Sequence, residues 1–268
     1  MHAESISLER TRQPLQKLHF LYHEVTPHGM GLYVIETNDL EKQIDLFMRI
    51  RNAESPGLWP EVTFDDGHIS DYEYALPILQ SRGFTARFFI TAGWTGQRPG
   101  YMGWRELRSL HESGQLVGAH GWSHAFLTRC TPRDLDVELG KARALLEDKL
   151  GTPITTMSLP GGRFNRRVLA ACREAGYTQV YTSVPRAEHE TLGFTVGRLN
   201  VPGDRSLKWI NNVLQPGSRA LSDLGRQYRR YRIKAVAKTV VGDRLYEKLW
   251  ALWNHKEPDG GVSGETAE

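Results

Sequence analysis

The stretch PEVTFDDG, Pro60 to Gly67, joins a short apolar run to two adjacent aspartates and a glycine. Its first five residues, Pro60–Phe64, have the length and the branched and aromatic side chains of a buried strand. Adjacent carboxylates repel each other, so a chain that needed only a polar turn would gain little from Asp65 and Asp66. We therefore expect these two side chains to have a chemical role at the end of the strand.

Runs of the same kind recur on both sides of this stretch and alternate with helical patterns. The predicted strands are Lys17–His23, Pro60–Phe64, Phe84–Ile90, Gln115–His120, Thr152–Pro160, Thr178–Val184 and Phe194–Val201. Helices are predicted between them, at 38–50, 70–83, 104–114, 131–149 and 164–177. This alternation predicts βα units around a mostly parallel sheet, so the fold is either a barrel or a doubly wound sheet.

Three helix ends carry recognisable signals. Asn38 can cap the first helix while Glu41 reaches back to it. Thr131 followed by Pro132 is a strong helix start, because a proline at the first helical position wastes no hydrogen bond. Gly83 is expected to stop the helix that precedes it.

The polar residues that follow the strands are expected to meet at one rim of the sheet, where the active sites of α/β proteins form. Asp65 and Asp66 follow one strand, and His23 and His120 end two others. The loop that begins at Pro160 follows a fourth strand. The chain order therefore predicts that these residues lie on the same rim.

The motif HGWSH, His120 to His124, is the second chemical signal. Its two histidines are four residues apart, and this spacing can bring both imidazoles to one ion, on a helical turn or in a tight loop. One aspartate of the Asp65–Asp66 pair can complete a His–His–Asp metal site with open positions for water and substrate. The other carboxylate then stays ionised beside the cation and can take a proton from metal-bound water.

VTFDDG, HGWSH and LPGGRFN, in this order, resemble the motifs of the polysaccharide deacetylase family, also called the NodB-homology domain or carbohydrate esterase family four. The resemblance covers about residues 18–203. It implies a distorted (β/α)7 barrel that removes N-acetyl groups, and sometimes O-acetyl groups, from sugars in a metal-dependent reaction. By the same resemblance Asp65 is the general base, and Asp66, His120 and His124 hold one divalent ion. Zinc is the expected ion, with cobalt, nickel and manganese as alternatives.

The third motif of the family is met only in part. It places an arginine two residues before a proline, and this chain has Ser158 two residues before Pro160. Asp65 is therefore expected to lack one orienting partner.

A late Leu-x-His motif, whose histidine is the general acid of family members, is absent. The corresponding GRLNV, Gly197 to Val201, resembles exopolysaccharide-cluster members with Arg-x-Asn-Val, and LYHEV near the start resembles the same branch. The leaving amine then needs another proton donor, with His189, His23 and His68 as candidates.

A few residues near the rim are candidates for contact with the substrate. His23 is either a groove residue or a packed histidine at a strand end. Trp122 lies between the two histidines of HGWSH and can stack on a sugar ring, with a place in the core or rim as the ordinary alternative. The loop of Pro160, Gly161 and Gly162 can supply a backbone N–H to an oxyanion.

Composition limits the class of protein and its partners. With 268 residues, 40% hydrophobic and 24% charged, the chain can form one large α/β domain. A net charge of +3 and the lack of a groove-reading motif argue against a nucleic-acid partner. The first twenty residues lack the apolar segment of a signal peptide, and only Cys130 and Cys172 are present, so we expect a reduced, cytoplasmic setting.

Four segments are expected along the chain. They are a polar N-terminal segment at 1–16, the barrel at 17–205, a basic helical extension at 206–256 and a disordered tail at 257–268. Residues 219–248 carry nine Lys or Arg against three Asp or Glu, which indicates basic, partly amphipathic helices. These helices are expected either to cover the barrel as a solvated face or to make peripheral contact with anionic lipids at the inner face of the membrane.

The leading hypothesis is a metal-dependent deacetylase that acts on an N-acetylated sugar, glycan or glycolipid precursor in polysaccharide metabolism. One alternative is a metal-binding but catalytically idle module that recognises a glycan or a lipid. Another is a hydrolase of a non-sugar amide on the same scaffold. Release of acetate from acetylated sugars separates the first hypothesis from the other two.

Overall fold

The computed structural model describes residues 16–29, 31–53, 58–189, 193–215 and 217–241. The chain divides into two compact units, Met1–Ser222 and Asp223–Glu268. Nearly all of the polar segment predicted at 1–16 lies outside the described residues, as do residues 242–256 of the predicted extension and the predicted tail at 257–268.

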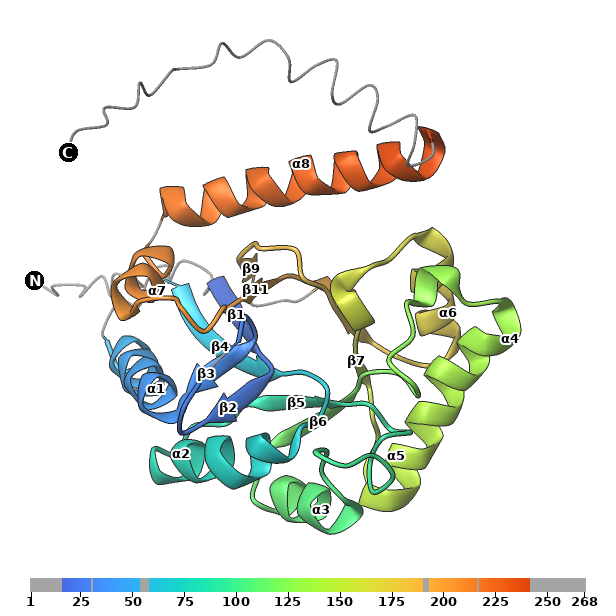
Figure 1. The fold of residues 1–268 in the computed structure, drawn as a ribbon, viewed down its shortest axis with the longest axis horizontal. Helices are drawn as coiled ribbons and strands as arrows, with labels where there is room; N and C mark the ends of the chain where they lie inside the picture. The colour runs from blue at the N-terminus through green and yellow to red at the C-terminus, as the bar shows by residue number, and fades with distance from the viewer. Residues whose placement is uncertain (1–15, 30, 54–57, 190–192, 216, 242–268) are drawn as a thin grey trace, which may run out of the picture. The chain divides into compact units, whose positions relative to one another are not determined.

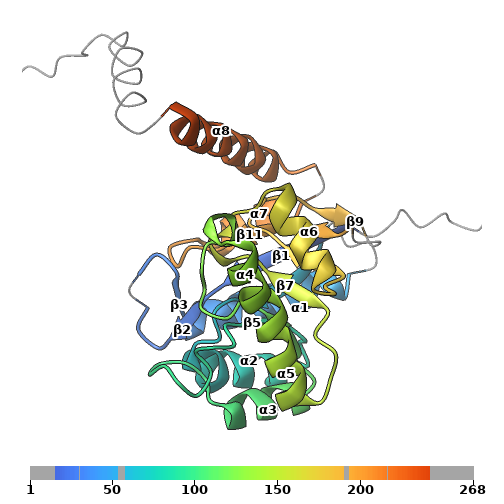
Figure 2. The same cartoon turned by 90° about the vertical axis from the view of Figure 1, so that its right-hand side faces the viewer.

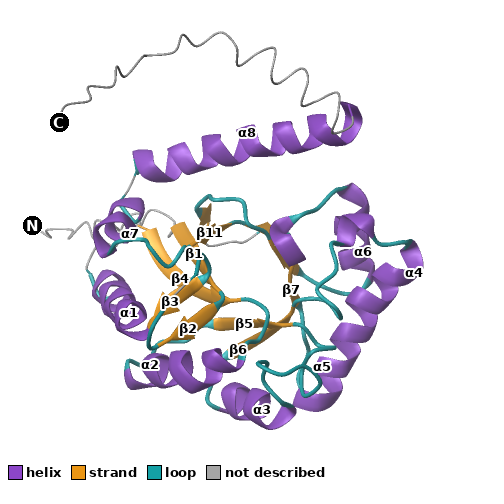
Figure 3. Ribbon diagram, viewed as in Figure 1, coloured by secondary structure: helices purple, strands orange, loops and turns teal. Residues whose placement is uncertain are grey.

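A parallel sheet forms the centre of the first unit and curves into a nearly closed barrel with helices outside it (Figure 1 and Figure 3). The hydrogen-bonded order is β10-β8-β7-β6-β5-β4-β1-β11, and all of these neighbours are parallel. The strands are β1 (Gln16–Tyr22), β4 (Leu58–Phe64), β5 (Arg87–Ile90), β6 (Leu116–Ala119), β7 (Thr156–Ser158), β8 (Gln179–Tyr181), β10 (Thr195–Val196) and β11 (Arg198–Asn200). The predicted distorted (β/α) barrel is confirmed, and the doubly wound alternative is wrong.

The short strands β10 and β11 are two halves of one segment that closes the barrel. β10 pairs with β8, β11 pairs with β1, and only Gly197 separates the two halves in sequence. A Cβ atom at Gly197 would lie 2.5 Å from Cγ of Arg186 and 2.6 Å from the carbonyl oxygen of Val184, so the close approach requires glycine. With this divided strand counted once, the described sheet has the seven parallel strands of the predicted barrel.

Two small pieces of sheet complete the strands. β9 (Glu188–His189) pairs antiparallel with the start of β1. β2 (Glu24–Thr26) and β3 (Val34–Glu36) form a separate parallel pair directly after β1 in the chain.

Helices surround the barrel, as the two perpendicular views show (Figure 1 and Figure 2). They are α1 (Thr37–Arg51), α2 (Leu76–Ser81), α3 (Trp104–Glu112), α4 (Pro132–Leu135), α5 (Ala142–Leu150), α6 (Arg166–Glu174) and α7 (Leu207–Val213). The π-helical turn η1 (Asp71–Ala75) leads directly into α2, and η3 (Asp136–Lys141) joins α4 to α5. The short 3₁₀ turns η2 (Leu127–Arg129) and η4 (Pro160–Gly162) lie in loops.

Two of the three predicted helix-end signals are found in the structure. The Thr131 hydroxyl accepts a hydrogen bond from the Asp134 amide at the start of α4. Gly83 adopts the left-handed conformation two residues after α2 ends. The predicted Asn38 cap is wrong: α1 begins at Thr37, and no side chain caps it, so Asn38 is already inside the first turn.

The last two described helices belong to the region predicted as a basic extension. α7 is part of the first unit. Its Ile210 and Val213 side chains are buried, and the Leu214 carbonyl accepts a hydrogen bond from the Leu58 amide. α8 (Arg219–Val241) crosses the boundary between the two units. Among the described helices, none combines the length and the apolar character that a bilayer crossing requires.

Aromatic side chains fill the layer between the barrel and its helices. Phe20 of β1 stacks on Phe47 of α1 with ring centroids 4.7 Å apart, and Phe64 of β4 stacks on Phe88 of β5 at 4.8 Å. All four rings are fully buried. Because Phe64 directly precedes Asp65, this packing fixes the strand end from which the two aspartates project.

Replacing Phe88 with alanine should therefore lower the free energy of unfolding by about 3–5 kcal/mol, through lost burial and the cavity left beside Phe64. Urea unfolding followed by circular dichroism measures the change. Leu32→Ala is the control, because the Leu32 side chain is 63% exposed and its truncation should change stability by no more than about 0.5 kcal/mol. Equal effects of the two substitutions would show that the aromatic layer does not stabilise the barrel.

Candidate metal and catalytic site

The predicted chemical residues meet at the carboxyl ends of neighbouring strands. Asp65 and Asp66 follow β4, and His120 follows β6. Backbone hydrogen bonds continue the sheet to this rim: the Asp65 amide donates to the Tyr22 carbonyl at 3.0 Å, and the His120 amide donates to the Ile90 carbonyl at 2.8 Å. The rim residues are therefore held by the barrel itself.

Asp66, His120 and His124 form the one cluster of possible metal ligands found among the described residues, with ligand atoms within 4.8 Å of one another. Nε2 of His120 lies 3.2 Å from Oδ1 of Asp66, and Nε2 of His124 lies 3.3 Å from the same oxygen. The imidazole rings of the two histidines are 5.0 Å apart between centroids. Two nitrogens and one oxygen thus face a common point.

The tautomer of neutral His120 follows from its other ring nitrogen. Nδ1 lies 2.9 Å from the carbonyl oxygen of Ser158, which can only accept, so Nδ1 carries the proton. Nε2 then presents a lone pair toward Asp66. In metal sites, the ring nitrogen of a histidine that does not bind the metal commonly donates such a hydrogen bond, which orients the imidazole.

Electrostatics favour a positive charge at this point. Burial alone would lower the pKa of His120, but Asp65 and Asp66 outweigh it and raise that pKa. The pKa of His124 is lowered, first by burial and then by His120, so His124 is the more readily neutral of the two. The buried Oδ1 of Asp66 has no hydrogen-bond partner among the described residues. A divalent cation fits this set of one carboxylate and two imidazoles.

Two of the three candidate ligand residues have a strained backbone. Asp66 has φ 76° and His124 has φ 62°, and no other non-glycine residue of the described chain has a positive φ. Such conformations cost energy in residues with a side chain and persist where the surroundings enforce them, often at functional sites.

Glu138 enforces the conformation of the HGWSH loop, and the sequence did not indicate this role. Its buried carboxylate accepts hydrogen bonds from the Trp122 amide at 2.9 Å and the Ser123 amide at 3.0 Å, and also from the Ser123 hydroxyl. Gly121 lies against it, and a Cβ there would be 2.8 Å from Oε2. The loop that carries His124 is therefore anchored to η3. No local pattern links Glu138 to a loop so far away in sequence.

Asp65 is buried and held by a fully buried arginine, Arg198. Nη1 and Nη2 of Arg198 donate to the two carboxylate oxygens at 2.6 and 2.8 Å, and the Ser158 hydroxyl donates to Oδ2 at 2.9 Å. Burial alone would raise the pKa of Asp65, but Arg198, followed by His120, holds it well below its usual range. Asp65 is therefore ionised and fixed in orientation.

The expectation that Asp65 lacks an orienting partner is thus wrong. Ser158 stands where the third motif of the family has its arginine. The guanidinium that contacts Asp65 belongs instead to Arg198 of β11, and it also donates a hydrogen bond to Ser158 Oγ at 2.7 Å. The sequence carried one overlooked signal: an arginine inside GRLNV, a segment otherwise suited to a buried strand, needs a buried counter-ion.

The predicted substrate contacts have different surroundings. His23 follows β1, with its ring 4.9 Å from that of Tyr33, which is 49% exposed. The Lys141 ammonium lies 3.9 Å from the centre of the Trp122 ring and covers one of its faces. Pro160 and Gly162 are buried in η4, whereas Gly161 is exposed.

The structure separates the histidines considered as proton donors. His189 pairs with Gln16 at the amino end of β1, the opposite end of the barrel from Asp65, so it cannot reach the site. His68 shares a hydrogen bond with the Ser70 hydroxyl at 2.8 Å and lies against Tyr101. His23 senses Asp65 and Asp66 electrostatically, although burial gives it a lowered pKa.

Known proteins with similar sequences share the part of the chain that carries this site. The family model for polysaccharide deacetylase matches residues 60–180, which contain Asp65, Asp66 and both histidines of HGWSH. The chain is similar to YxkH of Bacillus subtilis, with 27% identity over 144 residues, or 53% of this chain and 51% of that protein. It is also similar to the peptidoglycan-N-acetylglucosamine deacetylase PgdA of Listeria monocytogenes, with 33% identity over 108 residues, or 40% of this chain and 22% of that protein. The chain spans about half, or less, of the length of these relatives.

A solved structure agrees with the architecture. The deacetylase PplD of Streptococcus pyogenes, in complex with acetate, aligns with a TM-score of 0.66 and 18% identity over 76% of this chain and 100% of that one. At this identity the likeness shows the fold alone. The chain is thus similar to polysaccharide deacetylases over the part that carries the site, and it shares their barrel fold.

Proposed function

We propose that this protein is a metal-dependent hydrolase that removes N-acetyl groups from a sugar, glycan or glycolipid precursor. The observation that carries the proposal is the convergence of Asp66, His120 and His124 at the barrel rim, next to a carboxylate that Arg198 keeps ionised. The similarity to polysaccharide deacetylases supports sugar deacetylation as the reaction. We also propose that the substrate comes from polysaccharide assembly, in line with the resemblance to the exopolysaccharide-cluster branch.

The three ligands would hold one divalent ion, with zinc as the first choice and cobalt, nickel or manganese as alternatives. Such an ion supplies Lewis acidity, which polarises a carbonyl and lowers the pKa of water toward about 7. The Ser158 carbonyl keeps the Nε2 lone pair of His120 available, and Glu138 holds the loop of His124 in place.

Asp65 acts as the general base that takes the proton from the attacking water. Its low pKa makes it a weak base, so its contribution depends on position, which the two-pronged contact from Arg198 fixes. A backbone N–H of the turn at Gly161 and Gly162 is suited to stabilise the oxyanion, as the sequence predicts. Acetate and a free amine are the products.

His23 is proposed as the proton donor to the leaving amine. Among the candidates it follows β1, the strand adjacent to β4. Burial lowers the pKa of His23, while Asp65 and Asp66 oppose this shift and favour the protonated form that a proton donor needs. Tyr33 packs against its ring and is half exposed, which places an aromatic surface for sugar contact beside it. Trp122 keeps a proposed role in sugar contact through the ring face that Lys141 leaves free.

The absent late histidine favours one alternative, a metal-binding but catalytically idle module that recognises a glycan or lipid. The other alternative, a hydrolase of a non-sugar amide, rested on the missing arginine of the third motif. It loses that support because Asp65 does have an arginine partner, Arg198. A protein that binds about one metal ion per chain and releases no acetate from any acetylated sugar would support the idle module.

We also propose a cytoplasmic location with peripheral contact at the inner face of the membrane. The sequence of α8 carries seven Lys or Arg against one Asp, which suits contact with anionic lipids. Both cysteines are free thiols, in keeping with a reducing compartment. An N-acetylated sugar remains the proposed substrate, and nucleic acid is not a proposed partner.

Asp65→Asn should lower kcat/KM for acetate release by about 10²–10⁴, because the amide cannot accept the proton from water. Acetate is measured with N-acetylated chitooligosaccharides and glycolipids as substrates. Asp148→Asn is the matched control, since Asp148 is an exposed residue whose side chain pairs with the neighbouring Lys149. Equal acetate release from wild type and Asp65→Asn would end the proposed role of Asp65.

Arg198→Lys should lower kcat about ten- to hundredfold, because an ammonium keeps the charge but loses the fork that orients Asp65. Arg198→Met should in addition raise the pKa of Asp65, so the acid limb of the kcat/KM profile should move to higher pH. Ionised Asp65 stabilises the fold above its unfolded-state pKa, and this stabilisation is lost only as the pH falls through its lower folded-state pKa.

The control for both substitutions is Arg133→Met, at an exposed arginine of α4. Urea unfolding confirms that each variant is folded under assay conditions. Unchanged kcat and an unchanged acid limb in the folded Arg198 variants would contradict the proposed orientation of Asp65.

A further inference from the structure

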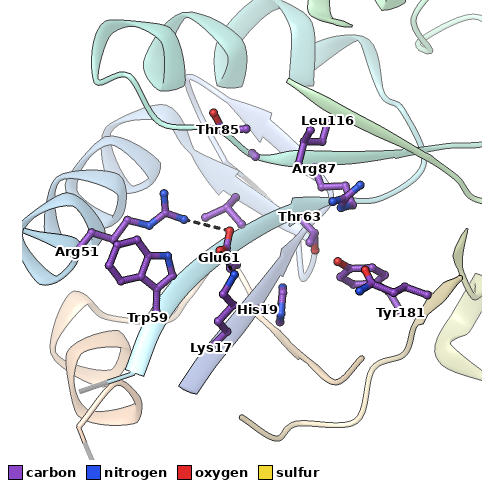
Figure 4. Close-up of a pocket in the computed structure, with 13 residues that line it drawn as sticks. Lys17, His19, Arg51, Trp59, Glu61, Thr63, Thr85, Arg87, Leu116 and Tyr181 are labelled. Carbon is purple, nitrogen blue, oxygen red and sulfur yellow. Dashed lines mark hydrogen bonds and ion pairs between the residues drawn. The ribbon is translucent and has the colours of Figure 1, made fainter. Parts of the chain in front are cut away.

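A cavity lies inside the barrel at the amino ends of its strands, away from the proposed metal site. Its volume is about 640 Å³, and its lining comes mainly from β1, β4, β5 and β8 (Figure 4). Lys17 and His19 are alternate residues of β1, Glu61 and Thr63 are alternate residues of β4, and all four face this space. We call it the barrel-floor pocket.

Positive charge exceeds negative charge in the lining. The pocket is lined by Lys17, Arg51 and Arg87 against a single carboxylate, Glu61. Lys17 and Arg51 both pair with that carboxylate, at 3.5 and 3.1 Å. Three cations against one carboxylate give the described lining a net charge of +2.

Arg87 is the cation without an acidic partner among the described residues. Its Nη1 donates to the Thr156 hydroxyl at 3.2 Å, and its guanidinium lies 5.7 Å from the centre of the Tyr181 ring. The side chain is only partly exposed, so solvent screens its charge incompletely. An arginine in this position is ready to donate to an oxyanion.

His19 supplies an independent observation. Only 4% of its surface is exposed, and its Nε2 has no hydrogen-bond partner among the described residues. Burial, followed by Lys17, Arg198 and Arg87, lowers the pKa of His19 to about 3, so the imidazole is neutral at physiological pH. A buried polar atom without a partner costs free energy that a ligand can recover. Figure 4 shows His19 between Lys17 and Tyr181.

We propose that the barrel-floor pocket binds a phosphate group, either as inorganic phosphate or as part of a small phosphorylated molecule. The net charge of +2 in the described lining matches the charge of about −1.5 to −2 that a phosphate group carries near neutral pH, whereas a carboxylate would neutralise only one positive charge. Arg87 and Lys17 supply the charge, and His19 supplies an N–H donor. The volume leaves room for an attached group beside Trp59 and Leu116.

Arg198 separates this pocket from the catalytic site. Thr63 lines the pocket and accepts a hydrogen bond from Arg198 Nη1 at 3.2 Å, while the same guanidinium holds Asp65 on its other side. Phosphate bound at the floor therefore does not touch the proposed metal ligands, and the two sites can be tested separately.

Isothermal titration of the metal-loaded full chain with inorganic phosphate, at constant ionic strength, tests the proposal. Arg87→Gln should weaken binding at least about tenfold, because it removes a charge-assisted hydrogen bond and keeps a polar side chain. Arg133→Gln removes a positive charge from an exposed position on α4 and should leave binding unchanged. His124→Asn alters the metal end of the barrel and should also leave it unchanged. Lys17→Gln is the second pocket variant if Arg87→Gln does not fold.

Glucose 6-phosphate serves as a second titrant to identify the source of the phosphate group. Tighter binding than inorganic phosphate would assign the site to a phosphorylated sugar, and weaker binding would assign it to the free ion. Absence of binding by wild type at millimolar phosphate would overturn the proposal. Binding that survives Arg87→Gln and Lys17→Gln but is lost in His124→Asn would overturn it as well, since the ion would then sit at the metal site.

Discussion

The buried ion pair between Arg198 and Asp65 is the interaction on which the arrangement of this protein depends. A fully buried guanidinium is costly unless its donors are satisfied, and here Arg198 donates to both oxygens of Asp65, to Ser158, to Thr63 and to the Thr182 carbonyl. It can enter the barrel only because Gly197 lets the closing strand pass close to its neighbours. Closing the barrel and setting the ionisation state of Asp65 are therefore one structural event.

Around this pair the barrel has opposite electrostatic character at its two ends. At the carboxyl ends of the strands, carboxylates predominate, and burial together with Asp66 raises the pKa of the fully buried Asp71, so that rim attracts positive charge. At the amino ends, Lys17, Arg51 and Arg87 outnumber Glu61. The first environment suits a divalent cation and the second suits an oxyanion, with Arg198 between them. The two proposed ligands thus follow from one distribution of charge along the barrel.

Local sequence patterns predicted most of the fold and the meeting of Asp66 with His120 and His124, because short stretches encode the strand ends that carry these residues. The strand before Asp65 and Asp66, the spacing of HGWSH and the Thr131 cap are all encoded within a few residues. What the sequence did not reveal depends on contacts between distant segments. Arg198 meets Asp65 across 133 positions, and Glu138 meets the HGWSH loop across 15 and 16. The Asn38 cap was wrong because β3 leads directly into α1, whose N-cap position is Glu36, two residues earlier.

The central claim is that Asp66, His120 and His124 bind a common cation beside Asp65. A crystal grown with zinc and measured on both sides of the zinc absorption edge tests it most directly. The account predicts one anomalous difference peak, about 2.0–2.2 Å from an oxygen of Asp66 and from Nε2 of each histidine, with the Asp65 carboxylate still held by Arg198. A peak bound elsewhere on the chain, or none at this rim under saturating zinc, would contradict it.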